Sequence, residues 1–329
     1  MKGRWGAWLL GAAVACAAQS AAPPHSYQYF RNGAAKDKTA RPRAGYALMG
    51  GGTDQDEAFR WLCEHADGGD FLVLRATGTD DYNPYVQGLC KLNSVATLIL
   101  PDRASANDPF VATAIAHAAA VFIAGGDQAN YIRNWAETPV ERELRSAVRR
   151  GVPIGGTSAG LAVLGQYIYS AQNDLPDGPD LSAEVALADP FARKVVIAPD
   201  LLGIPILRGV ITDSHFDTRH REGRLLAFMA RILARGPVRR IRGIGIDEKT
   251  AVLVDPDGAA RVMGVGEADF FEASVRPQEC AAHRPLTFGP VSEVVVHTGE
   301  RFDLRAWRGA EASAEIEVKR GKLGSGSAQ

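Results

Sequence analysis

The stretch V-P-I-G-G-T-S-A-G-L-A-V-L-G, residues Val152–Gly165, is the most informative local pattern of this chain. A short apolar run enters two glycines and a threonine, Ser158 follows at the apex, and small and apolar residues continue as a helix. Within the stretch, Gly156–Gly160 fits the G-x-S-x-G pattern of a nucleophile elbow, a sharp strand-to-helix turn that admits only glycine-sized neighbours. The pattern predicts Ser158 as a nucleophile, with backbone N–H groups of Gly126 and Ala159 holding an oxyanion. A plain glycine-rich turn is the alternative.

Short apolar runs alternate with helical segments on both sides of this turn. Runs typical of buried strands lie at Tyr46–Met49, Phe71–Leu74, Ala96–Leu100, Ala120–Ala124 and Val152–Ile154. Strands that are apolar on both faces and alternate with helices predict an α/β fold, in which a parallel-core sheet is flanked by helices on both faces. Ligands bind such sheets beyond the carboxyl ends of the strands, so we expect a site there.

Three consecutive glycines, Gly50–Gly52, follow the first of these runs. A glycine turn after a strand is typical of dinucleotide-binding folds, but Gln55 stands where the third glycine of G-x-G-x-x-G belongs. We therefore expect these glycines to let the backbone approach a neighbouring loop or a substrate.

The composition and the two ends of the chain bound its organisation. The chain has 329 residues, is 46% hydrophobic and carries a net charge of -1, which gives no electrostatic reason to expect nucleic acid or an anionic membrane. A basic start, an apolar run too short to span a bilayer and a series of small residues predict a signal peptide over residues 1–22 and a secreted or periplasmic protein. A lipoprotein processing site at Cys16 is the minor alternative. We expect a flexible lead-in over residues 23–42, a single α/β domain over 43–318 and a disordered tail over 319–329.

Export makes disulfide bonds possible. The mature chain keeps Cys63, Cys90 and Cys280. Cys63 lies on an expected helix and Cys90 precedes the next strand, which favours a bridge between them and leaves Cys280 unpaired. Three buried thiols are the alternative, and no Cys/His spacing indicates zinc.

A serine nucleophile needs a base, and the base needs a third group that fixes its orientation. Of the seven histidines, His215 is the one that directly follows an apolar strand inside a dense polar cluster, Asp213–Arg224. The orienting acid should also end a strand, and Asp247 and Glu248 both qualify. The acidic and histidine side chains around His215 also suggest a metal site, but the arginines of the cluster argue against a bound cation.

Three of these arginines, Arg219, Arg221 and Arg224, lie near the start of an expected helix. The helix dipole disfavours cations there, so we expect them to face carboxylates of a substrate or of the protein itself. Asp213 is a candidate partner for a substrate guanidinium. A solvated basic face is the alternative.

Four motifs of the chain resemble the cyanophycinase family of serine peptidases, family S51. They are F-I-A-G-G-D-Q (Phe122–Gln128), G-T-S-A-G (Gly156–Gly160), D-S-H-F-D-T-R-H-R-E-G-R (Asp213–Arg224) and G-I-G-I-D-E-K-T-A (Gly243–Ala251). The family belongs to the clan of dipeptidase E, and its fold is similar to class I glutamine amidotransferases and flavodoxin. The block R-A-T-G-T-D-D-Y-N-P-Y also resembles exported members.

The resemblance implies the roles of eight side chains. They are the nucleophile Ser158, the base His215, the acid Glu248 and the pocket residues Gln128, Asp213, Arg219, Arg221 and Arg224. It further implies hydrolysis of cyanophycin or related β-aspartyl peptides without metal or cofactor, and it is compatible with a homodimer. One departure concerns the substrate, because Ser214 stands where members that degrade cyanophycin commonly carry glutamine. An exported peptide-binding or sensing protein without turnover, or an amidohydrolase with another acidic substrate, is the alternative.

Overall fold

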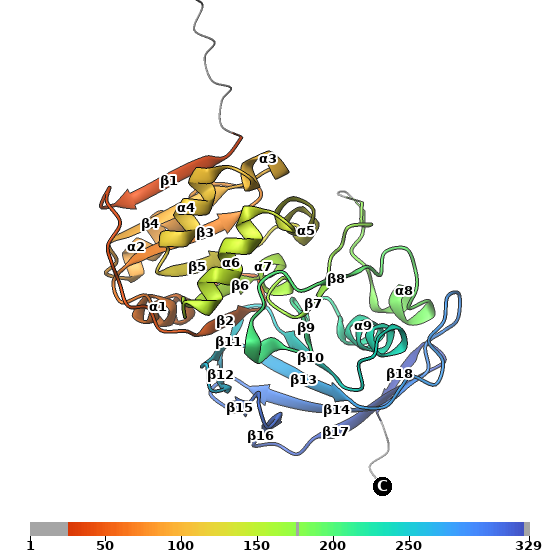
Figure 1. Ribbon diagram of the computed structural model, residues 1–329. Helices are drawn as coiled ribbons and strands as arrows, with labels where there is room; N and C mark the ends of the chain where they lie inside the picture. The colour runs from red at the N-terminus through yellow and green to blue at the C-terminus, as the bar shows by residue number, and fades with distance from the viewer. Residues whose placement is uncertain (1–25, 176–177, 326–329) are drawn as a thin grey trace, which may run out of the picture.

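The computed structural model describes residues 26–175 and 178–325 of the chain (Figure 1). The expected signal peptide, with Cys16, lies outside the described residues. Within them, the strands form two sheets, of ten and eight strands. The ten-stranded sheet has the order β1 (Gln28–Gly33), β4 (Ser94–Ile99), β3 (Asp70–Arg75), β5 (Ala120–Ile123), β6 (Ile154–Thr157), β2 (Tyr46–Met49), β11 (Thr250–Val254), β12 (Ala259–Gly264), β15 (Arg301–Asp303) and β16 (Arg308–Gly309).

The core of this sheet is parallel. Strands β4, β3, β5, β6 and β2 run in one direction, and the antiparallel strands β1 and β11 flank them. The helices of this half are α1 (Asp56–His65), α2 (Tyr82–Leu89), α3 (Arg103–Ala106), α4 (Pro109–His117), α5 (Gln128–Trp135), α6 (Pro139–Arg149) and α7 (Ala159–Ala162).

Alternate side chains of each parallel strand enter two different cores. In β3, Phe71 packs in the cluster that holds the apolar residues of α1, whereas Leu72 packs in the cluster that holds those of α4 and α6. Because successive side chains of a strand point to opposite faces, the helices cover both faces of the sheet. The predicted α/β fold with a parallel core flanked by helices is confirmed.

The remaining strands build a second sheet that the sequence pattern did not predict. The eight-stranded sheet has the order β18 (Lys322–Ser325), β17 (Ala314–Lys319), β14 (Phe288–His297), β13 (Glu267–Ala273), β10 (Ile241–Ile246), β9 (Val210–Asp213), β7 (Tyr167–Tyr169) and β8 (Ile197–Pro199). Only β7, β9 and β10 are parallel neighbours within it. Helix α9 (Glu222–Arg235) covers one face, α8 (Ala183–Ala188) packs on α9, and a short 3₁₀ helix (Pro205–Leu207) precedes β9.

The other face of this second sheet packs against the ten-stranded sheet. Ile244 and Phe270 belong to the same buried cluster as Leu48 and Val252 of the ten-stranded sheet. The two sheets therefore share one core where β9 and β10 approach β2 and β11 (Figure 1).

Two end segments differ from their expected disorder. Strand β1 lies inside the expected lead-in and pairs with the edge strand β4, and Tyr29 packs edge-on against the ring of Phe110. Strand β18 lies inside the expected tail and pairs with β17 through a two-residue turn, in which Arg320 and Gly321 both have positive φ. Both strands lie at sheet edges and hold at most two consecutive apolar side chains, so they carry no long apolar run.

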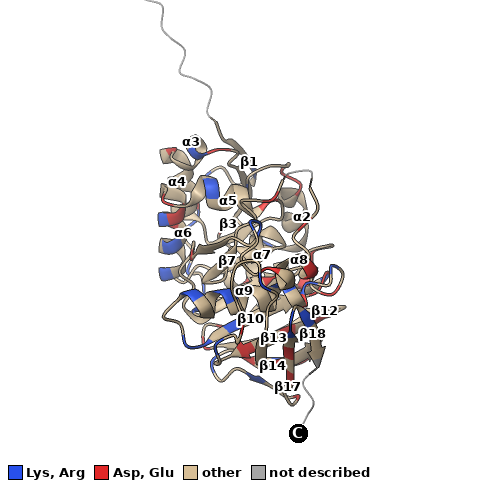
Figure 2. Ribbon diagram, turned by 90° about the vertical axis from the view of Figure 1, so that its right-hand side faces the viewer, with Lys and Arg blue, Asp and Glu red and all other residues tan. Residues whose placement is uncertain are grey.

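The structure contains the expected Cys63–Cys90 disulfide, with a Cα–Cα distance of 6.2 Å. It ties α1 to the residue that follows α2, and Cys280 is unpaired. Figure 2 shows basic residues along α6 and acidic residues on β14 and β17. Residues of both charges are therefore distributed over this face of the molecule. Among residues 26–175 and 178–325, no helix is both long and apolar enough to cross a membrane.

Candidate active site

Ser158 occupies the turn between β6 and α7 in a strained backbone conformation. Its φ and ψ are 52° and -112°, and its N–H donates to the carbonyl oxygen of Met49. A Cβ on Gly160 would lie 1.9 Å from the carbonyl oxygen of Ile123, and one on Gly156 would lie 2.5 Å from that of Gly160. The two outer glycines of the G-x-S-x-G pattern are therefore required by close backbone approach, as a nucleophile elbow demands.

His215 follows β9 of the second sheet and faces Ser158 across the junction of the two sheets. Its Nε2 lies 2.8 Å from Ser158 Oγ, and its Nδ1 lies 2.5 Å from Glu248 Oε1. With a proton on Nδ1 donated to the carboxylate, Nε2 is free to accept the proton of the serine hydroxyl. The structure thus joins the three side chains in one hydrogen-bonded chain.

The acid of this chain comes from the turn between β10 and β11, which carries both acidic candidates. Glu248 contacts His215, whereas the carboxylate of Asp247 accepts backbone N–H groups of Asp217 and Glu267. The two neighbours therefore have different tasks. Asp247 holds two chain segments in place, and Glu248 is the one that orients the imidazole.

The electrostatics of the pair suit proton transfer at neutral pH. Burial lowers the pKa of His215, and Arg219 and Arg221 act in the same direction, although the hydrogen bond with Glu248 opposes them. The hydrogen bond from His215 in turn lowers the pKa of Glu248. At pH 7 the imidazole is therefore neutral and able to accept a proton, and the carboxylate is ionised.

The triple glycine Gly50–Gly52 lies directly against the imidazole and its acid. A Cβ on Gly51 would lie 2.5 Å from His215 Nε2, and one on Gly52 would lie 3.2 Å from Cβ of Glu248. The carbonyl oxygen of Gly50 accepts the His215 N–H at 2.7 Å. These glycines do approach neighbouring loops, as expected. The loops are those that carry His215 and Glu248, and the sequence did not indicate which loops they would be.

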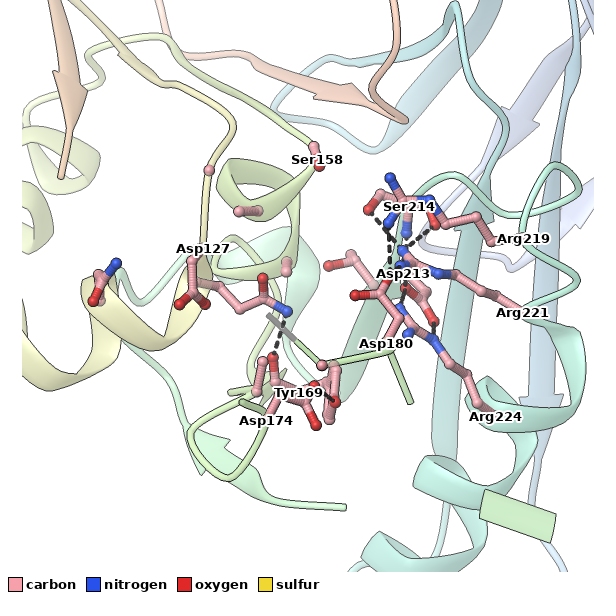
Figure 3. Close-up of a pocket in the computed structure, with 18 of the residues that line it drawn as sticks. Asp127, Ser158, Tyr169, Asp174, Asp180, Asp213, Ser214, Arg219, Arg221 and Arg224 are labelled. Carbon is pink, nitrogen blue, oxygen red and sulfur yellow. Dashed lines mark hydrogen bonds and ion pairs between the residues drawn. The ribbon is translucent and has the colours of Figure 1, made fainter. Parts of the chain in front are cut away.

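A pocket of about 410 Å³ opens beside Ser158 (Figure 3). Its lining includes all the remaining predicted site residues: Gly126, Gln128, Ala159, Asp213, Arg219, Arg221 and Arg224. Gln128 begins α5 and donates its side-chain amide to the carbonyl oxygen of Tyr169. Gly126 has a φ of +148°, a conformation that favours glycine, and lines the pocket together with Ala159 and Ser158.

The arginines of the pocket face carboxylates of the protein. Arg224 forms two hydrogen bonds with Asp213, of 2.7 and 2.6 Å, and their side chains are only 2% and 5% exposed. Arg221 donates to the carbonyl oxygen of Ser214 and lies 3.5 Å from Asp213. The expected pairing of these arginines with carboxylates of the protein is observed, and Asp213, the candidate partner for a substrate guanidinium, is bonded to Arg224.

Comparison with known proteins identifies the family. The sequence model of peptidase family S51 matches residues 76–262, more than half of the chain. The chain belongs to peptidase family S51. The chain is 30% identical to the cyanophycinase of Synechococcus elongatus over 222 residues, and 29% identical to that of Trichormus variabilis over 215 residues. The matched regions cover 65% and 64% of this chain and only 62% and 65% of the two relatives.

A solved structure has a similar fold. The crystal structure of a peptidase from an acI-B1 actinobacterium superposes with a TM-score of 0.51 at 18% sequence identity, and the match covers 80% of this chain and 98% of that one. At this identity the similarity concerns the fold alone.

The pocket also has polar lining residues that were not among the predicted site residues. Tyr169, Asp174 and Asp180 all line the pocket, on β7 and on the polar stretch that follows it. Tyr169 donates its hydroxyl to Asp174, and Asp180 accepts from Arg219 and Arg221. The stretch reads as an exposed loop because of its proline and glycine content, and no local pattern shows that it returns to the pocket.

Proposed function

We propose that this S51 peptidase is an exported serine peptidase that hydrolyses cyanophycin or related β-aspartyl peptides through Ser158, His215 and Glu248. The observation that carries the proposal is the unbroken hydrogen-bond chain from the serine hydroxyl through the imidazole to the carboxylate, with contacts of 2.8 and 2.5 Å, at the edge of a polar pocket. Such a chain activates a weak nucleophile by removing its proton as it attacks.

The proposed reaction proceeds through an acyl-enzyme. Ser158 Oγ attacks the scissile carbonyl carbon while its proton passes to His215 Nε2. The π electrons of the C=O bond move to the carbonyl oxygen, and the backbone N–H groups of Gly126 and Ala159 hold this oxyanion. The protonated imidazole, stabilised by Glu248, then gives its proton to the leaving amine as the C–N bond breaks. Water, deprotonated by the same imidazole, cleaves the ester and restores the serine. No step uses a metal or cofactor.

The substrate class rests on the relatives and on the charge of the pocket. The curated relatives are named cyanophycinases, and the pocket carries acidic and basic side chains together, as a polymer of aspartate and arginine would require. Ser214 lines the pocket next to His215, so the departure at this position is placed to alter substrate preference. A single domain, extended by β1 and β18 beyond the expected bounds, and a homodimer are part of the proposal.

Export is supported by two independent features of the chain. Residues 1–22 have the composition of a signal peptide, and the Cys63–Cys90 disulfide fits an oxidising compartment. Expression with the native N-terminus, followed by sequencing of the periplasmic or secreted product, tests it. A product that begins within residues 18–23 supports export, and one that stays in the cytoplasm with its start intact contradicts it.

The test of the chemistry is Ser158→Ala, assayed on cyanophycin and on β-aspartyl-arginine. We expect the variant to lose hydrolysis and labelling by a fluorophosphonate while keeping the unfolding transition of the wild type. Ser146→Ala on α6, which removes a hydroxyl bonded to Arg150 outside the pocket, is the matched control and should retain both. Unchanged hydrolysis by Ser158→Ala would reject the mechanism, and binding without hydrolysis by the wild type would favour a sensing role.

A further inference from the structure

Each arginine of the pocket is paired with a carboxylate of the protein, and these carboxylates differ greatly in solvent exposure. Arg224 and Asp213 are bound to each other and sealed from solvent, with exposed fractions of 2% and 5%. Asp180 places one carboxylate oxygen 2.6 Å from Arg219 Nη1 and 2.6 Å from Arg221 Nη2, and its side chain is 59% exposed. Among the described partners of the three arginines, Asp180 is thus the carboxylate that can leave (Figure 3).

The bridge made by Asp180 occupies donors of both Arg219 and Arg221. A carboxylate that accepts from two guanidinium groups at once satisfies the donors that a substrate carboxylate would use. Partial burial would raise the pKa of Asp180, but the positive charges of Arg221 and Arg219 outweigh it and hold this pKa below its usual value. Asp180 is therefore ionised at neutral pH and carries the same charge as the ligand group.

The place of this bridge relative to the nucleophile makes it relevant to substrate. Asp180, Arg219 and Arg221 line the same pocket as Ser158. We propose that Asp180 is a specificity-determining residue, an internal competitor that holds Arg219 and Arg221 until a substrate carboxylate displaces it. The inference rests on the proposed function for its substrate class, but it concerns binding alone and not the chemistry at Ser158.

Competition of this kind predicts the sign of a substitution effect. Replacing the carboxylate by a neutral amide frees two guanidinium groups without changing the shape of the side chain, so a ligand carboxylate should bind more tightly. An exposed ion pair is worth up to about 1 kcal/mol, which corresponds to about a fivefold change in affinity. A role in organising the arginines predicts the opposite, since the arginines would lose their positions and the ligand would bind more weakly.

The experiment compares Ser158→Ala with Ser158→Ala/Asp180→Asn by calorimetry, using β-aspartyl-arginine and an analogue in which both carboxylates are carboxamides. We expect the Kd of the dipeptide to fall about fivefold in the double variant, and the Kd of the diamide to stay unchanged. The matched control is Asp37→Asn in the same background. Asp37 also lies against two basic side chains, Arg31 and His117, is 40% exposed, and lies outside the pocket.

A Kd for the dipeptide that is unchanged or raised by Asp180→Asn overturns the inference, as does an equal effect on the diamide or the absence of dipeptide binding to both proteins. In the active enzyme, Asp180→Asn should lower KM about fivefold and leave kcat unchanged. The outcomes separate the two proposals. If the wild type does not hydrolyse the proposed substrates but the calorimetric effect is observed, only the proposed function is rejected. If the wild type hydrolyses them and Asp180→Asn has no effect on binding, only the inference is rejected.

Discussion

Gly51→Ala is the substitution that most directly tests whether the glycine loop sets the geometry of the imidazole. Gly51 has a φ of +97°, and an added Cβ would lie 2.5 Å from His215 Nε2 and 2.6 Å from His215 Cε1. Nε2 is also the atom that lies 2.8 Å from Ser158 Oγ. The new methyl group would therefore crowd the ring atom that must accept the serine proton.

The size of the effect follows from two separate costs. Ordinary contacts of a Cβ begin near 3.4 Å, so the ring must retreat by about 1 Å or the loop must open by as much. A misplacement of about 1 Å in an active site lowers the rate by about 100-fold. The left-handed backbone adds about 1–2 kcal/mol of destabilisation, which is a loss of stability and not of catalysis.

Gly299→Ala separates these costs. Gly299 has a φ of +93°, and nothing lies within 4 Å of its added Cβ. We expect both variants to lose similar stability in urea titrations, whereas only Gly51→Ala should lose about 100-fold in kcat/KM on a peptide substrate. If Gly51→Ala keeps wild-type kcat/KM, or if Gly299→Ala loses as much, the loop does not hold the imidazole in place.

Three further predictions concern titratable groups. Glu248→Gln should lower kcat/KM by about 100-fold or more and move the acidic limb of its pH profile to lower pH, because the hydrogen bond that raises the pKa of His215 is lost. Asp213→Asn should lower the free energy of unfolding by about 3–5 kcal/mol in urea, because Arg224 is left buried without its counter-ion. Burial raises the pKa of Asp269 from 3.8 to about 8, so the folded state binds the proton more tightly and stability falls as pH rises from 3.8 towards 8. Asp269→Asn should flatten this fall in urea midpoints measured across that range, and an identical pH dependence in the two proteins would contradict it.

The parts of the site that could be predicted from sequence are those whose cause is local. The elbow is recognisable because Gly156 and Gly160 have no room for a Cβ, and this demand acts within five consecutive residues. His215 was found for a similar reason, since a polar cluster directly after an apolar strand identifies the end of that strand. In both cases the residues of one short stretch are enough to predict the local structure.

The parts that could not be predicted depend on contacts between distant segments. Asp247 and Glu248 are adjacent and both follow a strand, so only the packed turn decides which of them reaches His215. Asp180 reaches the arginines from a loop some 40 positions earlier, with no pattern in its own neighbourhood. The division of the strands between two sheets could not be predicted either, because an apolar run indicates a strand but does not say which distant strand it pairs with.

The two-sheet arrangement has a consequence for how the site is assembled. Ser158 comes from the ten-stranded sheet, His215 follows β9 of the eight-stranded sheet, and Glu248 lies in the turn that crosses from one sheet to the other. Neither sheet alone carries all three side chains, so their hydrogen bonds require that the sheets be docked. The backbone of Gly50 and Gly51 makes that docking specific, because their carbonyl oxygens accept the N–H groups of His215 and of the residue after Glu248. The glycine loop, which resembles a generic turn in sequence, therefore positions both the base and the acid relative to the serine.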